Sequence, residues 1–424
     1  MKIIDIIEKK KKGLELSKEE ISFAVNGYLK EEVKDYQMSA LLMAIWFNGM
    51  TDREIFDLTE VMLDSGNKID LSSIEGIKVD KHSSGGVGDK TTLVLAPLVA
   101  SCGVKMAKMS GRGLGHTGGT IDKLEAIEGF NVALTEKEFI DNVNKIGLAL
   151  TGQTGNVAPA DKKIYALRDV TGTVDSTALI ASSIMSKKLA SGANKLVIDL
   201  KLGNGALVKT LDEADRLGNL MVKIGKNFGL DTACFVTNMN EPLGKSIGNG
   251  LEVMEAIDCL KGKGPDDLRE LIIKLGTYLV SLGKNISEKK AEKEVTNNLD
   301  NGKAYSKFLE FVKIQGGNID KISIAPKVFS IKSNKEGFIT DIDALKLGEL
   351  ARNIGAGRFS KEDKIDYGVG FVLNKKVGDF VLENEELIKV YLNEKDIAIN
   401  DVLSCFKIEN DFKEKEPLIY KVIK

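Results

Sequence analysis

Two glycine-rich segments decide the fold of this chain: DKHSSGGVGDKTT at residues 80–92 and KMSGRGLGHTGGTIDKLE at residues 108–125. Each overlaps or follows a short apolar run that predicts a β-strand, at residues 77–79 and 104–109. The segments begin 28 residues apart, which is typical of two successive strand–loop–helix units. The chain contains two histidines, and each lies in one of these segments.

The composition of the two loops indicates an anion site. A phosphate dianion needs donors from closely approached backbone, which glycine permits, together with cationic side chains and hydroxyl groups. Each loop is predicted to end at a helix N-terminus, which also favours an anion. Neither loop has the spacing of a Walker loop or of a dinucleotide fingerprint. The candidate phosphate ligands supply an ammonium or a hydroxyl group: Lys81, Ser83, Thr92, Lys108, Ser110 and Thr120.

The two histidines receive different interpretations. His82 lies inside a polar loop between Lys81 and Ser83, where an apolar core environment is not expected. Bound phosphate would stabilise its imidazolium form, so we expect a proton donor. His116, between two small residues, is better interpreted as a brace of the second loop.

Further cationic candidates lie on a later helical segment. Ser183 and Lys187 are four residues apart and therefore share one helix face. Arg168 lies on the preceding predicted helix. If this segment faces the glycine loops across a cleft, Arg168 and Lys187 supply positive charge to the far end of the ligand. The alternative is that both are solvated surface charges.

The composition restricts the class of protein. A chain of 424 residues is long enough for two or three domains. Its 60 basic and 62 acidic residues nearly cancel, which argues against a nucleic-acid surface. Four scattered cysteines are expected to be reduced and buried. The chain shows neither a signal-peptide pattern nor an apolar run of the roughly 18 residues that a membrane span requires, so we expect a cytoplasmic protein without a membrane partner.

The order of predicted elements gives an α/β fold class with three parts. Residues 1–70 are expected to form a small all-helical domain, joined by about 160–192, where helices follow one another without a strand. Strands alternate with helices in a large mixed α/β domain with a central sheet, formed by residues 71–159 and 193–330. Residues 331–424 have the short alternating strands of a β-rich C-terminal α+β domain. Ligands of such sheets bind at the carboxyl ends of the strands, where the glycine loops lie.

The residues that carry a resemblance are KHS at 81–83, GGVGD at 85–89, SGRGLGHTGGTIDKLE at 110–125 and YALRD at 165–169. With these motifs the chain resembles the thymidine/pyrimidine-nucleoside phosphorylase family over nearly its whole length. The resemblance implies reversible phosphorolysis of uridine, thymidine and 2′-deoxyuridine to the free base and α-D-ribose or 2-deoxyribose 1-phosphate. It also implies no organic cofactor and a homodimer formed through the helical domains.

Site residues follow from the resemblance position by position. The positions that match phosphate ligands are Lys81, Ser83, Thr92, Lys108, Met109, Ser110 and Thr120. The positions that match the nucleoside site are His82, Leu114, Tyr165, Arg168, Ser183 and Lys187. Of these, His82, Arg168 and Lys187 are the expected catalytic residues, which disperse negative charge on the departing base. Lys108 replaces the methionine of the strict thymidine enzymes, which favours an enzyme that also accepts uridine.

The resemblance further implies a monovalent cation site, expected to hold K⁺, that is built mostly from backbone oxygens. The matching positions are Gly88, Lys90, Leu243, Ser246 and Glu255. Lys90 and Ser246 stand at positions that vary in type within the family.

Three alternative functions remain open at this point. The first is a strict thymidine phosphorylase. The second is an enzyme like anthranilate phosphoribosyltransferase, which would require Mg²⁺ on a diphosphate substrate. The third is a metabolite-binding dimer without turnover, which the intact Lys81, His82, Arg168 and Lys187 argue against.

Overall fold

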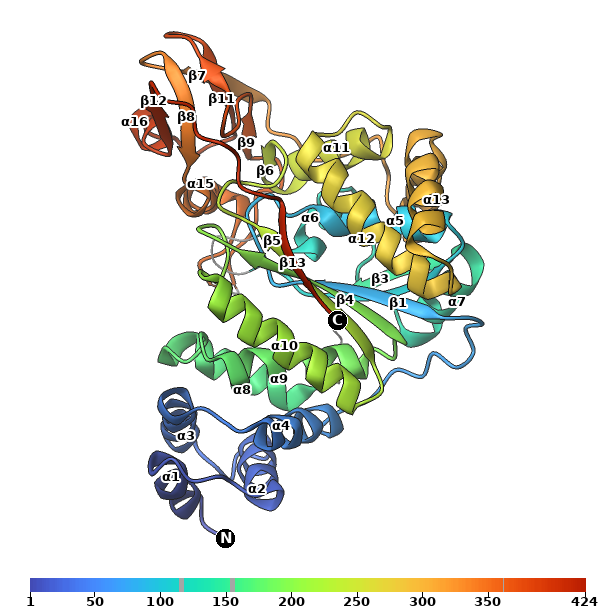
Figure 1. The fold of residues 1–424 in the computed structure, drawn as a ribbon, viewed down its shortest axis with the longest axis vertical. Helices are drawn as coiled ribbons and strands as arrows, with labels where there is room; N and C mark the ends of the chain where they lie inside the picture. The colour runs from blue at the N-terminus through green and yellow to red at the C-terminus, as the bar shows by residue number, and fades with distance from the viewer. Residues whose placement is uncertain (114–117, 153–156, 361) are drawn as a thin grey trace.

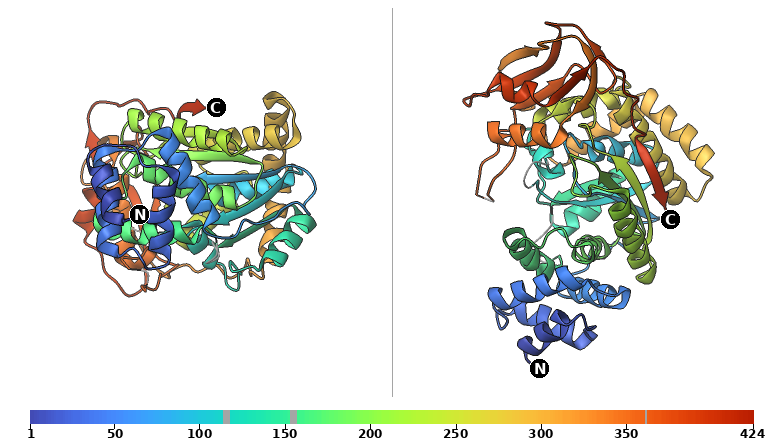
Figure 2. Two further views of the ribbon diagram at one scale, coloured as in Figure 1. Left: turned by 90° about the horizontal axis from the view of Figure 1, so that it is seen from below. Right: turned by 60° about the vertical axis from the view of Figure 1, so that its left-hand side comes forward.

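The structure is a computed structural model that describes residues 1–113, 118–152, 157–360 and 362–424. A helical part lies at one end, a six-stranded sheet covered by helices lies in the middle, and two small sheets lie at the other end (Figures 1 and 2). The α/β fold class with a helical part and a β-rich C-terminal part is therefore confirmed. Within the described residues, no helix is long and apolar enough to cross a membrane.

The helical part combines segments that are far apart in the sequence. Its helices are α1 (Ile3–Lys11), α2 (Lys18–Leu29), α3 (Asp35–Asn48), α4 (Asp52–Asp64), α8 (Pro159–Thr171) and α9 (Thr177–Ala190). Capping boxes at Ser17 and Thr51 start α2 and α4. Ile164 of α8 and Leu179 of α9 belong to the same buried apolar cluster as the side chains of α1 to α4. The helical return after residue 158 therefore packs on the N-terminal helices.

The central sheet has the strand order β13-β5-β4-β1-β2-β3. Its strands are β1 (Lys78–Ser83), β2 (Lys105–Ser110), β3 (Leu148–Gly152), β4 (Lys195–Leu202), β5 (Asp231–Asn238) and β13 (Ile419–Ile423). β1 to β5 run parallel, whereas β13 is antiparallel to β5. The two strands that carry the glycine loops, β1 and β2, are direct neighbours, and parallel strands present their loops at the same edge of a sheet.

Helices cover both faces of this sheet (Figure 1). α9 and α10 (Leu211–Asn227) share an apolar cluster with β4 and β5. The opposite face carries α5 (Thr91–Ser101) and α12 (Asp266–Lys284), backed by α13 (Glu288–Asp300) and α14 (Lys303–Ile314). Residues 91–100 of α5 are all buried, as expected for a helix with helices and strands around it. The remaining helices of this part are α6 (Thr120–Glu125), α7 (Glu136–Ile146) and α11 (Asn249–Leu260).

The C-terminal part contains two antiparallel sheets with their own apolar core. The four-stranded sheet has the order β6 (Ser246–Ile247), β9 (Gly370–Leu373), β11 (Glu386–Leu392) and β7 (Lys327–Lys332). The three-stranded sheet has the order β10 (Phe380–Val381), β8 (Gly337–Ile342) and β12 (Phe406–Glu409). Its helical elements are α15 (Ala344–Ala351), a π-helix (Arg352–Ala356) and α16 (Ile399–Leu403).

The predicted boundary at residue 331 is wrong in two respects. β7 begins at Lys327 and pairs with β11, so the C-terminal sheet starts before the boundary and also recruits β6 from the α/β domain. In the other direction, β13 leaves the C-terminal part and pairs with β5. β13 covers an edge of β5 that would otherwise expose unpaired backbone groups. Pairing between strands this far apart in sequence leaves no local sequence signal, which is why it was not predicted.

Candidate active site

The candidate phosphate ligands lie at the carboxyl ends of β1 and β2. Lys81 and Lys108 are adjacent on these strands, and the Nζ of Lys108 donates a hydrogen bond to the Lys81 carbonyl. Ser83 and Ser110 end the two strands. Thr92 and Thr120 lie in the first turns of α5 and α6, which follow the two loops. Sequence-distant hydroxyl and ammonium groups are thus gathered at one edge of the sheet.

Four buried lysines at this edge share two aspartates. The Nζ atoms of Lys81 and Lys201 lie 3.1 and 2.9 Å from the same Oδ2 of Asp199. On the other face of β1, the Nζ atoms of Lys188 and Lys108 lie 2.7 and 3.5 Å from the two oxygens of Asp80. The pairing leaves positive charge that is not neutralised by these two aspartates. Among the described residues, Asp199 Oδ2 is the one close carboxylate oxygen of both Lys81 and Lys201, and an ammonium has three N–H donors, so each lysine retains donors for an anion.

Asp89 organises the first loop. Its carboxylate accepts hydrogen bonds from the Ser83 hydroxyl and from the backbone N–H of Thr91, the latter at 3.1 Å. Burial alone would raise the pKa of Asp89, but Lys81 and the neighbouring Lys201 and Lys123 hold the pKa well below its usual range. Asp89 is therefore ionised and keeps the Ser83 hydroxyl in place at the end of β1.

In the protein without phosphate, His82 does not carry the charge that is expected of it beside bound phosphate. The ring is half-buried, and burial together with the positive charges of Lys188, Lys108, Lys187 and Lys81 lowers its pKa well below the usual value. The imidazole is therefore neutral at neutral pH in the protein without phosphate. A neutral imidazole retains one N–H donor, so it can still hydrogen-bond to an oxygen of the ligand.

Lys108 titrates in the physiological range. Burial and the charges of Lys188 and Lys81 outweigh the opposing effect of Asp80 and lower the pKa of Lys108 to about 7. An anion bound beside its ammonium group would favour the charged form and raise the pKa again.

This shift predicts proton uptake on anion binding. At pH 8 the free protein holds Lys108 largely neutral, so binding a dianion should recharge it and take up a proton, whereas at pH 6 the lysine is already charged. Sulfate is a suitable probe because it remains a dianion throughout this range. Calorimetry in two buffers of different ionisation enthalpy measures the uptake, and Lys108→Met should abolish the part that appears between pH 6 and 8. Equal uptake by both proteins would contradict the assignment.

The second cluster lies on α8 and α9 and contains four of the six predicted nucleoside ligands. The Nζ of Lys187 lies 2.8 Å from Asp161 and donates to the Ser183 hydroxyl at 3.1 Å. The ring centre of Tyr165 lies 5.8 Å from Lys187 Nζ and also 5.8 Å from the Arg168 guanidinium. The structure thus brings Tyr165, Arg168, Ser183 and Lys187 together, and it adds Asp161.

Arg168 stabilises the connection between α8 and α9 in this cluster. The side chain is buried, and its guanidinium donates to the carbonyls of Thr173, Val174 and Leu179 at 3.1, 2.7 and 3.1 Å. Three of its five N–H groups are therefore occupied in holding the connection between α8 and α9.

Lys188 joins the two clusters. It follows Lys187 on α9, and its Nζ reaches across to Asp80 on β1 and to the Met109 carbonyl on β2, at 2.7 and 3.1 Å. α9 is therefore held against the strands that carry the phosphate loops, with His82 between the two sets of residues.

Two predicted residues, Leu114 and His116, lie outside the described residues. The flanking part of the second loop is held by Arg112, which pairs with Asp122 and Glu125. The C-terminal part reaches the same acids, because Arg358 lies 2.8 Å from Asp122 and the Tyr367 hydroxyl donates to Glu125 at 3.0 Å.

Several residues of the site were not predicted from sequence, namely Asp80, Asp161, Lys188, Asp199 and Lys201. One signal was present. Asp199 and Lys201 alternate on an otherwise apolar strand, so both point to one face of the sheet, and charged side chains are seldom buried without a partner or a function.

The predicted cation ligands also meet, but around a lysine. The carbonyls of Leu243 and Ser246 and the carboxylate of Glu255 converge on the Nζ of Lys90. These oxygens suit a hard cation. A metal ion does not fit among them in this structure, because the Lys90 ammonium occupies their centre.

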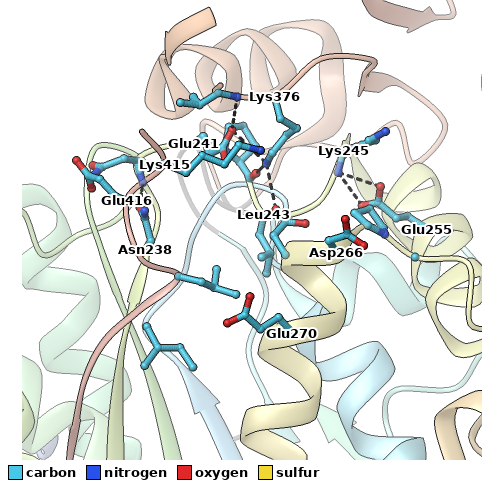
Figure 3. A pocket seen from close by; sticks show the side chains of 18 of the residues that line it. Asn238, Glu241, Leu243, Lys245, Glu255, Asp266, Glu270, Lys376, Lys415 and Glu416 are labelled. Carbon is cyan, nitrogen blue, oxygen red and sulfur yellow. Dashed lines mark hydrogen bonds and ion pairs between the residues drawn. The ribbon is translucent and has the colours of Figure 1, made fainter. Parts of the chain in front are cut away.

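A cavity of about 1460 Å³ borders this cation cage (Figure 3). Leu243 and Glu255 belong to its wall, together with α12 and residues 413–419 of the C-terminal segment. None of the described candidate phosphate ligands lines the cavity, so it is separate from the glycine loops.

Comparisons with known proteins identify three family domains along the chain. Residues 4–66 match the helical bundle domain of the glycosyl transferase family, and residues 75–305 match the a/b domain of that family. Residues 338–409 match the pyrimidine nucleoside phosphorylase C-terminal domain. Among solved structures, anthranilate phosphoribosyltransferase from Thermus thermophilus superposes with a TM-score of 0.57 at 16% identity, over 73% of this chain and 99% of that chain, which shows a shared fold.

Curated relatives match at much higher identity. The pyrimidine-nucleoside phosphorylase of Staphylococcus epidermidis is 53% identical over the whole of both chains. That of Bacillus subtilis is 54% identical over 94% of this chain and 93% of its own length. These matches support a pyrimidine-nucleoside phosphorylase and none of the three alternatives. The chain therefore belongs to the pyrimidine-nucleoside phosphorylase family of pentosyltransferase enzymes.

Proposed function

We propose that this enzyme cleaves uridine, thymidine and 2′-deoxyuridine with inorganic phosphate, reversibly, to the free base and the α-D-pentose 1-phosphate. The observation that carries the proposal is the juxtaposition of two clusters. Buried lysines with surplus positive charge and strand-end hydroxyls suit phosphate, and Lys188 joins them to the cluster of Tyr165, Ser183 and Lys187 that suits a pyrimidine.

The reaction follows from this arrangement. A phosphate oxygen attacks C1′ of the sugar while the bond from C1′ to N1 of the base breaks, and the configuration at C1′ inverts. The bonding electron pair leaves with the base. The proton of hydrogen phosphate is then transferred to the base, which gives the neutral free base as product. Lys187 and a ring N–H of His82 stabilise the negative charge that develops on the base oxygens. Excluding water from the site makes phosphate the nucleophile.

A product assay tests this function. Purified protein should release uracil from uridine only when phosphate is present, and arsenate should replace phosphate because it presents the same oxygen nucleophile. Chromatography of the bases, with thymidine and 2′-deoxyuridine run in parallel, measures the substrate range. Release of no base from any of the three nucleosides would refute the proposal, and release without phosphate would indicate a hydrolase.

The same proposal includes a homodimer formed through the helical parts. Large apolar side chains are exposed on α3 and at the end of α8, including Tyr36, Phe47 and Val170 at 73, 72 and 78%. Phe47 also packs against the exposed ring of Trp46, with ring centres 5.0 Å apart, and contiguous exposed apolar surface is typical of an interface. Light scattering should therefore give twice the 46.1 kDa mass of one chain. Phe47→Glu should shift the protein toward monomers, and a wild-type protein of single-chain mass would contradict the dimer.

A further inference from the structure

Lys90 lies at the centre of a closed cage of oxygen atoms. Its Nζ donates to the Leu243 carbonyl at 2.9 Å, to the Ser246 carbonyl at 2.8 Å and to the Glu255 carboxylate. A lysine ammonium has three N–H donors and no acceptor. The cage provides one acceptor for each donor, and the Lys90 side chain is fully buried.

The backbone around the cage is shaped for this group. A Cβ on Gly88 would lie 2.7 Å from the Leu243 carbonyl oxygen, so only glycine permits the approach. Gly244 adopts a φ of +67° and lies against the Glu255 carboxylate, where a side chain would collide. Lys90 is also the residue before the first turn of α5, and a positive charge at a helix N-terminus is unfavourable. The Glu255 carboxylate offsets that cost.

We infer that the tethered ammonium of Lys90 replaces the exchangeable monovalent cation that the family resemblance implies, so that this enzyme needs no potassium. Three of the residues expected to bind K⁺, Leu243, Ser246 and Glu255, place oxygen atoms around the site, but the chain supplies its own cation. This corrects the interpretation of Lys90 as a ligand, because its own ammonium group takes the position of the cation.

The position of the cage indicates what the ammonium stabilises. Ser246 begins β6, which pairs with β9 of the C-terminal sheet, whereas Lys90 belongs to the first glycine loop of the α/β domain. From the opposite side, Lys376 of the C-terminal part donates to the Gly244 carbonyl at 3.0 Å and lies 3.1 Å from Asp267. Two lysines therefore hold one loop, residues 242–246, at the junction of the two parts.

Melting temperature and activity in different salts test the inference. Wild-type protein should show the same melting temperature and the same uridine phosphorolysis rate in KCl and in choline chloride at equal ionic strength. Lys90→Thr leaves Glu255 buried without its partner, so in choline chloride it should melt roughly 5 °C or more below wild type. KCl or NH₄Cl should restore its melting temperature in a saturable manner.

Two variants serve as controls. Lys137→Thr removes an exposed lysine and should have no salt-specific effect. Lys90→Met combined with Glu255→Gln removes both charges and should show no potassium response. The melting measurement does not rest on the proposed phosphorolysis, so its result stands even if the activity assay fails.

Two results would overturn the inference. The first is a saturable rise of wild-type melting temperature with potassium, which needs no variant. The second is a Lys90→Thr protein that potassium does not stabilise. If that variant does not fold in choline chloride, it is refolded in KCl. Recovery of the folded protein in KCl supports the inference, and failure to fold in both salts refutes it.

Discussion

Lys187→Met should lower kcat/KM for uridine by about 10²- to 10³-fold, the effect of removing one donor from the charge developing in a transition state. The Lys187 ammonium is partly exposed, points toward the ring of Tyr165 and is oriented by Asp161 and Ser183. Methionine preserves the length of the side chain and removes the charge. Steady-state kinetics with saturating phosphate measure the loss.

A matched control separates catalysis from stability. Lys163 on α8 has a similar exposure, 30% against 27% for Lys187, and its Nζ donates to the Tyr28 carbonyl. Lys163→Met should keep activity near that of wild type. If Lys187→Met loses less than tenfold, about 1.4 kcal/mol, the base-binding role is wrong. Arg168→Ala is a less direct test, because it also releases three carbonyls that hold the α8–α9 connection.

Lys81→Met should lower kcat/KM for phosphate by about 10²-fold or more, because truncating a buried charged donor costs on the order of 2–5 kcal/mol. The fold should persist, since Asp199 keeps its ion pair with Lys201 and its hydrogen bond from Thr237, at 2.9 and 2.6 Å. Phosphate raises the melting temperature of any native state that binds it. The variant should lose that rise, which a thermal-shift titration measures without turnover.

The control for this variant is Lys195→Met, at the start of β4, where the lysine pairs with Asp231 at the protein surface. It should retain both the activity and the phosphate-induced shift. An undiminished shift in Lys81→Met would show that phosphate binds elsewhere.

The local part of the site was predictable from sequence. Glycine, hydroxyl and lysine side chains after an apolar strand indicate an anion loop wherever they occur, so Lys81, Ser83, Lys108 and Ser110 are identifiable from the sequence alone. Capping boxes at Ser17 and Thr51 likewise depend on four consecutive residues. Both kinds of motif are predictable because the interactions that stabilise them lie within one turn of the chain.

The charge state of His82 and the role of the Lys90 ammonium group were not predictable from local sequence. His82 was expected to be an imidazolium beside bound phosphate; in the protein without phosphate, burial and the charges of Lys188 of α9 and Lys108 of β2 lower its pKa well below the usual value. Lys90 was expected to contribute to a cation site, and only the loop at residues 243–246 shows that its own ammonium group lies between the Leu243 and Ser246 carbonyls. In both cases the deciding neighbours are distant in sequence.

By itself, therefore, the sequence determined the α/β class, the position of the two glycine loops at the ends of neighbouring strands, and the family. Each depends on periodicity or on a contiguous motif, which a single strand–loop–helix unit contains. Tertiary structure alone decided how Asp80 and Asp199 are shared among four lysines, how β13 completes the central sheet, and which cation fills the cage beside α5. Those features arise when long-range packing removes charged groups from water and compels them to find partners.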